Sequence, residues 1–248
     1  MICPNILIPL AAPSSPHQSQ GQLPISCLTV IDGKPVIQRT LQNLGFSGRH
    51  IFVIQEEHDK SYNLQYVLSL FVDRCSFCVL NRDTEGSACT ALEATKHIDN
   101  SSPLIIANPD QILTWKSSDF IREVEQQNVD GALVTLSTEE ALWRFGYVSA
   151  RKNGTVLQVS AKKRISNVAT TGVFYWRRGS DFVRYANQMI GKGIQTNSSF
   201  YVSTVFNQAI ADHKSIIHYS VPHMWDLSNA TGIDRYRSYL SEQLISHG

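Results

Sequence analysis

The sequence predicts an α/β fold in which helices flank a mostly parallel β-sheet. Three observations lead to this prediction. Short apolar runs alternate along the chain with stretches whose apolar residues recur at helical spacing. The run 104–107 contains no polar residue, as expected for a strand that is buried on both faces. The chain has 248 residues, of which 42% are hydrophobic, so it can bury a sizeable core.

Strands and helices alternate strictly in the first half of the chain. The expected strands are 5–10, 50–54, 76–80, 104–107 and 131–136, and the expected helices are 33–45, 62–71, 84–97 and 120–127. Pro35 suits the first turn of the first helix, where its missing N–H is not needed. Thr84 is expected to cap the third helix. This alternation favours right-handed βαβ crossovers and a parallel sheet.

The pattern changes after residue 136. Strands are expected at 145–150, 155–160 and 170–176 without long helices between them, and Asn153-Gly154 is a strong turn signal. Helices are then expected at 180–190 and 202–210, a strand at 215–221 and a terminal helix at 234–244. No internal repeat or interdomain linker is evident. We therefore expect a single domain, 1–248, with a β-rich insertion in its second half.

Composition excludes several classes of function. The net charge is +1 and no basic stripe occurs, which argues against a nucleic-acid partner. No apolar run is long enough to span a membrane, and no signal peptide is evident at the N-terminus, so we expect a cytoplasmic protein. The five cysteines lack the spacing of a disulfide framework, which fits reduced thiols. Cys75 and Cys78 form an isolated CxxC without the further ligands that zinc needs.

Asp110 is the first candidate site residue. It follows the buried strand 104–107 after Asn108 and Pro109. Ligands of open α/β sheets bind outside the carboxyl ends of the strands. A carboxylate at this place can bind a hard cation or a ribose hydroxyl. The alternative is a turn or helix-capping role.

The order of several short motifs resembles that of the sugar-phosphate nucleotidylyltransferases, or NDP-sugar pyrophosphorylases, whose fold is similar to that of GT-A glycosyltransferases. The motifs are 6–11, Gly33-Lys34-Pro35, Thr84-Glu85-Gly86, 107–111, 172–175, 200–203 and 225–227. The resemblance covers nearly the whole chain and implies a Rossmann-like (GT-A-like) fold. It also implies a Mg²⁺-dependent reaction, in which the phosphate of a sugar 1-phosphate attacks the α-phosphorus of a nucleoside triphosphate and pyrophosphate leaves.

The resemblance also implies roles for single residues. Nucleotide contacts would fall on Leu10, Ala11, Ala12, Gly86 and Asp110. Sugar or sugar-phosphate contacts would fall on Lys162 and Gly172, and Mg²⁺ would bind Asp110 and Asp226. Two alternatives remain open at this point. Asp226 could simply cap the segment that follows it, and Lys162 could belong to a solvated basic turn with Lys163 and Arg164.

The first loop departs from the family's pattern. The segment after the first strand lacks the family's glycines, and Pro16 occupies the place of the expected arginine. Ile25 replaces the lysine of the family's Pro-Lys-Pro, and Ala161 replaces the glutamate before Lys162. Loss of a single donor aimed at developing charge costs on the order of a hundredfold in rate. No catalytic residue can therefore be assigned in this loop.

Three functions fit these observations. The first is a nucleotidyltransferase that makes NDP-sugars, for example for polysaccharide synthesis, and that binds nucleotide and sugar phosphate, either alone or as a homo-oligomer. The second is a catalytically impaired relative that binds nucleotide or NDP-sugar as a regulatory or assembly subunit. The third is a GT-A-type glycosyltransferase, which would not need the loop arginine and lysine. Its usual Asp-x-Asp metal motif, however, reads Asn108-Pro109-Asp110 here.

Overall fold

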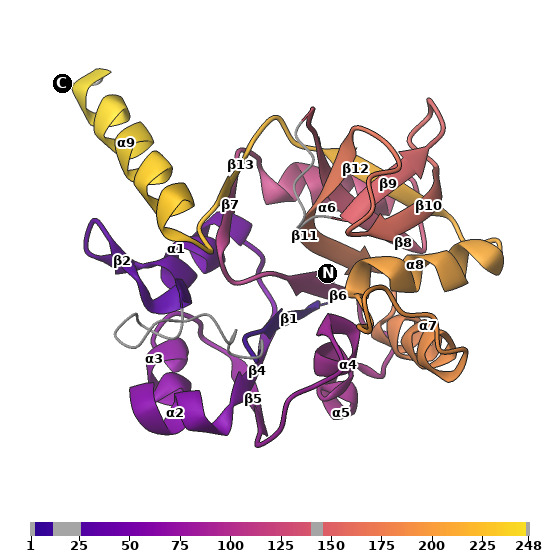
Figure 1. Cartoon of the computed structure of the whole chain (residues 1–248), viewed down its shortest axis with the longest axis horizontal. Helices are drawn as coiled ribbons and strands as arrows, with labels where there is room; N and C mark the ends of the chain where they lie inside the picture. The colour runs from indigo at the N-terminus through magenta and orange to yellow at the C-terminus, as the bar shows by residue number, and fades with distance from the viewer. Residues whose placement is uncertain (1–2, 12–25, 140–145, 247–248) are drawn as a thin grey trace.

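A mixed β-sheet forms the centre of the protein (Figure 1). The computed structural model describes residues 3–11, 26–139 and 146–246, and these residues contain a nine-stranded sheet. Its parallel part consists, in spatial order, of β6 (Leu104–Ala107), β1 (Asn5–Pro9), β4 (Arg49–Gln55) and β5 (Cys75–Leu80). All four strands lie where the sequence predicts them.

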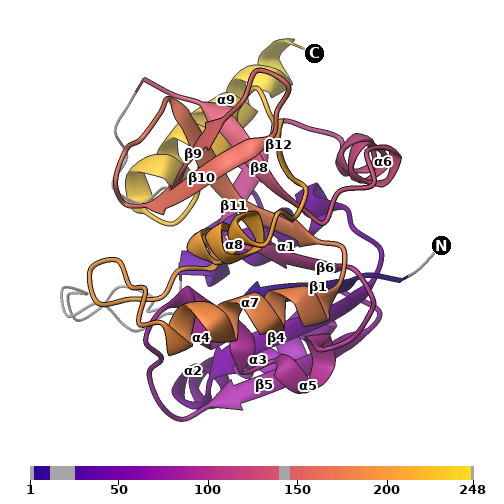
Figure 2. The same ribbon diagram turned by 90° about the vertical axis from the view of Figure 1, so that its right-hand side faces the viewer.

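The second part of the sheet is largely antiparallel and contains the predicted β-rich insertion. Its strands are β8 (Gly131–Ser137), β9 (Gly146–Ala150), β10 (Val156–Ala161), β11 (Val168–Trp176) and β12 (Ile216–Ser220). β11 joins the two parts, because it pairs antiparallel with β6 on one side and with β8 and β9 on the other. Figure 2 shows β8, β9, β10 and β12 grouped on one side of β11, with β1, β4 and β5 on the other. The predicted fold class is confirmed.

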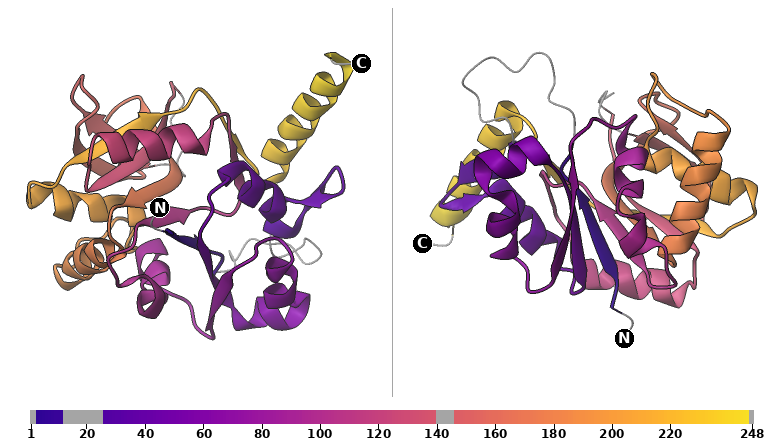
Figure 3. Two further views of the ribbon diagram at one scale, coloured as in Figure 1. Left: turned by 180° about the vertical axis from the view of Figure 1, so that it is seen from behind. Right: turned by 90° about the horizontal axis from the view of Figure 1, so that it is seen from below.

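Helices cover both faces of the sheet. The helices of the described residues are α1 (Val36–Leu44), α2 (Glu56–Tyr62), α3 (Leu64–Ser69), α4 (Ser87–Leu92), α5 (Thr95–Ile98), α6 (Ser117–Gln126), α7 (Gly179–Gly191), α8 (Val202–Ala211), α9 (Ala230–Ser246) and the short 3-10 helix η1 (Ser26–Leu28), and of these α9 projects away from the sheet (Figure 1). Successive side chains of a strand point to opposite faces. Ile6 and Ile8 therefore pack with α1, α3 and α6, whereas Leu7 packs with α4, α5, α7 and α8. Figure 3 shows the two groups of helices on either side of the strands. None of the described helices is long and apolar enough to cross a membrane.

The first two predicted helices differ from the observed ones. The helix expected at 33–45 begins at Val36, because Asp32 and Gly33 have positive φ and form the turn of a hairpin between β2 (Val30–Ile31) and β3 (Lys34–Pro35). Lys34 therefore lies on a strand and not on the helix. The helix expected at 62–71 is α3, whereas α2 directly before it was not predicted; Asn63, with a φ of 49°, separates the two helices. A left-handed residue at this point interrupts the helical hydrogen-bond ladder.

The third predicted helix also begins later and is interrupted. Thr84 does not cap it; its Oγ1 lies 2.5 Å from Oγ1 of Thr90, and Gly86 is the residue that precedes the first turn of α4. The chain leaves the helix after Leu92 and re-enters it as α5 at Thr95.

Two further differences concern the second half. The terminal helix begins at Ala230, four residues earlier than expected, because Oδ1 of Asn229 accepts a hydrogen bond from the Gly232 N–H at 2.9 Å and caps it. The expected strand 145–150 is β9, and residue 145 lies outside the described residues.

Gly86 connects the first turn of α4 to the segment before α8. The Phe200 N–H donates to the Glu85 carbonyl at 2.8 Å, and the Ala88 N–H donates to the Phe200 carbonyl at 3.0 Å. A Cβ on Gly86 would lie 2.5 Å from the carbonyl oxygen of Phe200 and 2.7 Å from its nitrogen. The φ of Gly86 is +117°, which a residue with a side chain rarely adopts. Close packing of two backbones therefore requires glycine here.

We predict that Gly86→Ala lowers the free energy of unfolding by at least about 1 kcal/mol, because the added methyl group meets backbone atoms and the required φ is strained. Urea denaturation followed by circular dichroism measures the change. The control is Gly191→Ala at the end of α7, where a Cβ would meet nothing within 4 Å. That variant should be neutral or slightly more stable. Equal stability of both variants would contradict this account of Gly86.

Candidate functional site

The structure places Asp110 and Asp226 side by side at the carboxyl end of β6. After Asp110 the chain forms β7 (Gln111–Leu113), which pairs antiparallel with β13 (Met224–Asp226). In this ladder Asp226 lies opposite Gln111, and the Leu227 N–H donates to the Asp110 carbonyl at 2.8 Å. Residues 110 and 226 are far apart in sequence, so this short ladder alone makes them neighbours. Both residues are partly buried.

One oxygen of Asp226 has a local structural role. Its Oδ1 accepts a hydrogen bond from the Ser228 N–H at 3.0 Å and so shapes the turn before α9. The helix itself is capped by Asn229, not by Asp226. A carboxylate has about four lone-pair sites on two oxygens, so this turn is compatible with a second interaction.

The donor set fits a magnesium ion that is held jointly by protein and substrate. Mg²⁺ is usually bound by one or two carboxylates together with substrate phosphates and water. Asp110 and Asp226 provide two carboxylates on neighbouring backbone positions. Within residues 3–11, 26–139 and 146–246, no cluster of three or more His, Cys, Asp or Glu side chains could hold a metal by itself. A divalent ion at these two carboxylates would therefore need further ligands from substrate or water.

Asp110 also influences a nearby thiol. Cys27 in η1 is 2% exposed, and burial raises the pKa of its thiol well above the ordinary value. The negative charge of Asp110 raises this pKa further. Cys27 is therefore a protonated thiol at neutral pH, and the segment that contains η1 lies near Asp110.

Two side-chain amides from the segment around Asp110, those of Asn108 and Gln111, pack over Gly172. The Asn108 N–H donates to the Gly172 carbonyl at 3.0 Å, and the pairing of β11 is irregular between Thr170 and Phe174. The φ of Gly172 is +87°, and a Cβ there would lie 2.2 Å from Nδ2 of Asn108 and 3.0 Å from Oε1 of Gln111. The missing side chain of Gly172 thus leaves room for both amides.

Sequence reasoning did not single out Gln111. The side chain is 3% exposed, and its Nε2 has no hydrogen-bond partner in the part of the chain that the structure describes. A buried amide donor without a partner costs free energy, and such groups are rare in folded proteins. The signal in the sequence was its position directly after Asp110.

Lys162 lies in a strained turn at the end of β10. Its φ is +63°, and the Lys163 N–H donates to the Ala161 carbonyl at 2.7 Å, so Lys162 is the central residue of a γ-turn. Positive φ is uncommon for a residue with a side chain, and such strain clusters at functional sites. Nζ of Lys162 lies 5.3 Å from the centre of the Tyr201 ring, which directly precedes α8.

The three basic residues 162–164 differ in their surroundings. Arg164 braces the turn between β10 and β11, because its Nη1 donates to the Glu139 carbonyl at 2.8 Å and its Nη2 donates to Oδ1 of Asn167 at 2.5 Å. Lys163 is exposed, whereas Lys162 is partly buried. The segment is therefore not a uniformly solvated basic turn.

Most of the site residues expected from the resemblance lie at one edge of the sheet. Ala161 pairs with Gly146, whose N–H donates to Oγ1 of Thr170 at 3.3 Å, so the Lys162 turn lies close to the Gly172 bulge. The packing of Gly86 on Phe200 brings the start of α4 next to Tyr201 and hence to Lys162.

The end of β1 reaches the same edge as the end of β6, because the two strands are parallel. Leu10 is 7% exposed and Ala11 is fully buried. Ala12, Pro16 and Ile25 lie outside the described residues.

The comparisons with known proteins agree with this architecture. A nucleoside-diphosphate-sugar pyrophosphorylase from Vibrio cholerae is similar in structure, with a TM-score of 0.79 and 16% sequence identity. The alignment covers 94% of this chain and 99% of the chain from Vibrio cholerae. A UDP-glucose pyrophosphorylase complexed with UDP-glucose has 14% identity, coverage of 98% and 100%, and a TM-score of 0.77. The inositol-1-phosphate CTP transferase from T. maritima has 11% identity, coverage of 97% and 95%, and a TM-score of 0.72. At these identities the likeness shows the fold.

Sequence comparison shows the family. No curated protein sequence matches the chain. The family model described as nucleotidyl transferase matches residues 22–225, which is most of the chain. The matched range contains Gly86, Asp110, Lys162 and Gly172, and it begins after β1 and after most of the segment whose sequence departs from the family's first loop. The chain therefore belongs to the nucleotidyl transferase family.

Proposed function

We propose that the protein transfers a nucleotidyl group from a nucleoside triphosphate to a sugar 1-phosphate or a similar phosphate acceptor and releases pyrophosphate. The observation that carries this proposal is the β7–β13 ladder, which sets Asp110 beside Asp226 at the carboxyl end of β6. Two aspartates on paired backbone segments after a strand of this fold suit the magnesium ion that accompanies nucleotide phosphates. Family membership supports the same reaction class.

The chemistry requires little more than positioning and charge neutralisation. An oxygen of the acceptor phosphate forms a bond to the α-phosphorus, and the bond from the α-phosphorus to the bridging oxygen of pyrophosphate breaks. Bound Mg²⁺ would supply positive charge to the phosphates, and Asp110 and Asp226 would hold it. Lys162 would bind the acceptor phosphate, because its turn presents the ammonium group beside Tyr201. Gly172 and the amide of Gln111 would contact the sugar, where Nε2 of Gln111 would gain an acceptor.

Three further features belong to this proposal. The product would be an NDP-sugar of the kind consumed in polysaccharide synthesis. The reaction would take place in the cytoplasm, in agreement with five cysteines that are all unpaired thiols. Assembly into a homo-oligomer would leave the chemistry unchanged, since every residue invoked comes from one chain.

A second function is favoured by the sequence of the first loop. Pro16 and Ile25 replace the arginine and lysine that the family uses on the triphosphate, and neither can neutralise its charge. A binding subunit that holds nucleotide or NDP-sugar without turnover would need Asp110 and Gly172 but not those cations. Pyrophosphate release separates the two functions directly.

We predict that Asp110→Asn abolishes Mg²⁺-dependent nucleotide binding, because the amide is neutral and coordinates a hard cation weakly. A thermal-shift panel of nucleoside triphosphates and NDP-sugars, with and without Mg²⁺, measures the loss. A ligand at a hundred times its dissociation constant stabilises the native state by about 2.7 kcal/mol, which such a panel detects. The control is Asp73→Asn at an exposed position far from β6 in the sheet. Unaltered Mg²⁺-dependent binding by the Asp110 variant would contradict the metal role.

Turnover decides between the enzyme and the binding subunit. Release of pyrophosphate from a nucleoside triphosphate and a sugar 1-phosphate, lost in Asp110→Asn, would rule out the binding subunit. Mg²⁺-dependent binding without any pyrophosphate release would favour it.

We also predict that Lys162→Ala weakens binding of the sugar phosphate or NDP-sugar by about tenfold or more, since a charge-assisted hydrogen bond is lost. Isothermal titration calorimetry measures the dissociation constant. Lys163→Ala is a matched control, because it removes the same charge from the neighbouring, exposed position. Equal effects of the two substitutions would mean that the basic turn attracts anions only through its net charge.

A further inference from the structure

A pocket lies at the opposite edge of the sheet from Asp110. Its volume is 470 Å³, which is in the range of small-molecule sites. The pocket is lined where β6 begins and β11 ends: Pro103 precedes β6, Tyr175 lies on β11, and Arg177 and Arg178 follow it. β6 leads from this pocket toward Asp110, so the length of this strand separates the pocket from Asp110.

Two arginines give the pocket its chemistry. Nε of Arg177 donates to the Val129 carbonyl at 2.7 Å, whereas its buried Nη2 has no acceptor among residues 3–11, 26–139 and 146–246. Arg178 is exposed, and its side chain forms no ion pair or hydrogen bond with any residue that the structure describes. Guanidinium groups with unused donors recognise phosphate or carboxylate oxygens in a bidentate manner.

The positive charge of the pocket comes from these two side chains rather than from the N-terminus of α7. The Gly179 N–H donates to the Ser102 carbonyl at 2.9 Å, and the Ser180 N–H donates to the Asn100 carbonyl at 3.0 Å. The first N–H groups of the helix are therefore already bonded within the protein. The cations available to an anion in the pocket are therefore the side chains of Arg177 and Arg178.

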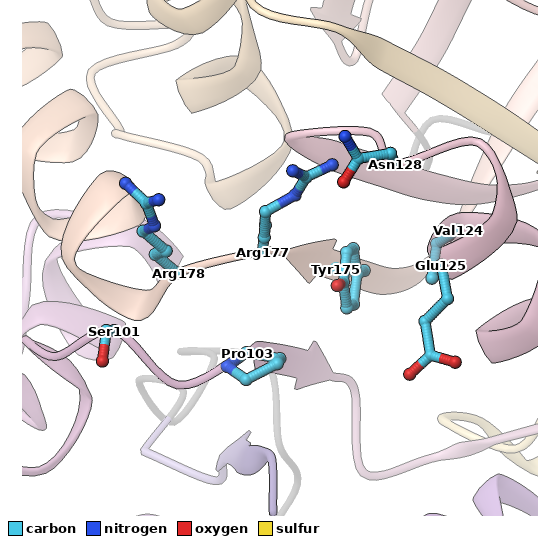
Figure 4. Close-up of a pocket in the computed structure, with 8 residues that line it drawn as sticks. All are labelled: Ser101, Pro103, Val124, Glu125, Asn128, Tyr175, Arg177 and Arg178. Carbon is cyan, nitrogen blue, oxygen red and sulfur yellow. The ribbon is translucent and has the colours of Figure 1, made fainter. Parts of the chain in front are cut away.

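The rest of the lining suits a hydroxylated ring. Figure 4 shows Tyr175 between Arg177 and Glu125, with Pro103 below it and Asn128 near the Arg177 guanidinium. Burial raises the pKa of the Tyr175 hydroxyl, the charge of Arg177 lowers it, and the charge of Glu125 raises it. The pocket thus combines an apolar wall, two separate cations and a carboxylate that accepts hydrogen bonds.

We propose that this pocket binds a small phosphate monoester whose body is a hydroxylated ring, such as a sugar phosphate or a nucleoside monophosphate. Arg177 and Arg178 bind the phosphate, the ring lies against Tyr175 and Pro103, and Glu125 accepts hydrogen bonds from ring hydroxyls. The ligand occupies a site separate from the crevice at Asp110, so both sites can be filled at once.

Titration calorimetry in the presence of EDTA tests this proposal, because metal-dependent binding at Asp110 is then suppressed. The probes are inorganic phosphate, a hexose 6-phosphate and a nucleoside 5′-monophosphate. We expect at least one ester to bind the wild type and Asp110→Asn equally. Arg178→Gln, at an exposed position, should weaken this binding by about tenfold or more. Arg177→Lys should also weaken binding by about tenfold or more. Its ammonium group can still donate to the Val129 carbonyl, so this contact within the protein is kept.

The control is Arg151→Gln, which removes an equal charge from the exposed turn after β9 and should leave binding unchanged. The ester that binds more tightly identifies the ring. Four results would overturn the proposal: no binding of any probe, binding that depends on Asp110 rather than Arg178, an equal loss in the Arg151 variant, or inorganic phosphate binding as tightly as the esters. A failed pyrophosphate assay would leave these results unaffected, so the two proposals fail separately.

Discussion

The pairing of β11 with β6 is the constraint on which the rest of the structure depends. Four residue pairs, from Val173 with Ala107 to Trp176 with Leu104, join the antiparallel insertion to the parallel part of the sheet. Trp176 is fully buried and stacks on Phe206 with a centroid distance of 4.3 Å, which fixes α8 over the same junction. Aromatic contacts of this kind contribute beyond the area they bury. The position of β11 therefore determines which residues lie beside the carboxyl end of β6 and which lie beside its start.

Two parts of β11 lie beside different chemistry. In the middle of the strand the bulge at Gly172 leaves room for the side-chain amides of Asn108 and Gln111. At its carboxyl end the strand continues into Arg177 and Arg178, which line the pocket at the start of β6. An acidic edge suits a cation with nucleotide phosphates, and a basic edge suits a phosphate without a metal. One strand thus positions two sites of opposite charge.

The candidate site depends on contacts between segments far apart in the chain. Lys162 is placed by a γ-turn and by Tyr201, Asp226 by a three-residue strand, and Gly86 by the backbone of Phe200. Because all of these contacts except that of Lys162 with Tyr201 involve backbone geometry, the backbone of the candidate site is held in place before any ligand binds. Preorganisation of this kind suits transfer chemistry that relies on positioning.

The sequence by itself determined the class of fold and the place of Asp110. Buried strands and amphipathic helices leave periodic patterns, so β1, β4, β5, β6 and β11 were all predicted, and a carboxylate after β6 had to reach the edge of the sheet. Helix boundaries were less well determined, because Asn63 and Asp32 adopt left-handed conformations that follow from local turns rather than periodicity.

Only the tertiary structure decided which distant residues meet. The strands β7 and β13 have three residues each, too few for a periodic pattern, so only the family resemblance implied that Asp226 and Asp110 meet, and the ladder that pairs their segments is seen only in the structure. The same holds for the unpartnered Nε2 of Gln111 and for the two arginines after β11, since burial and missing partners are properties of the packed molecule. The local sequence pattern determines where most strands and helices form, whereas the chemistry of both sites arises from contacts between segments that are far apart in the chain.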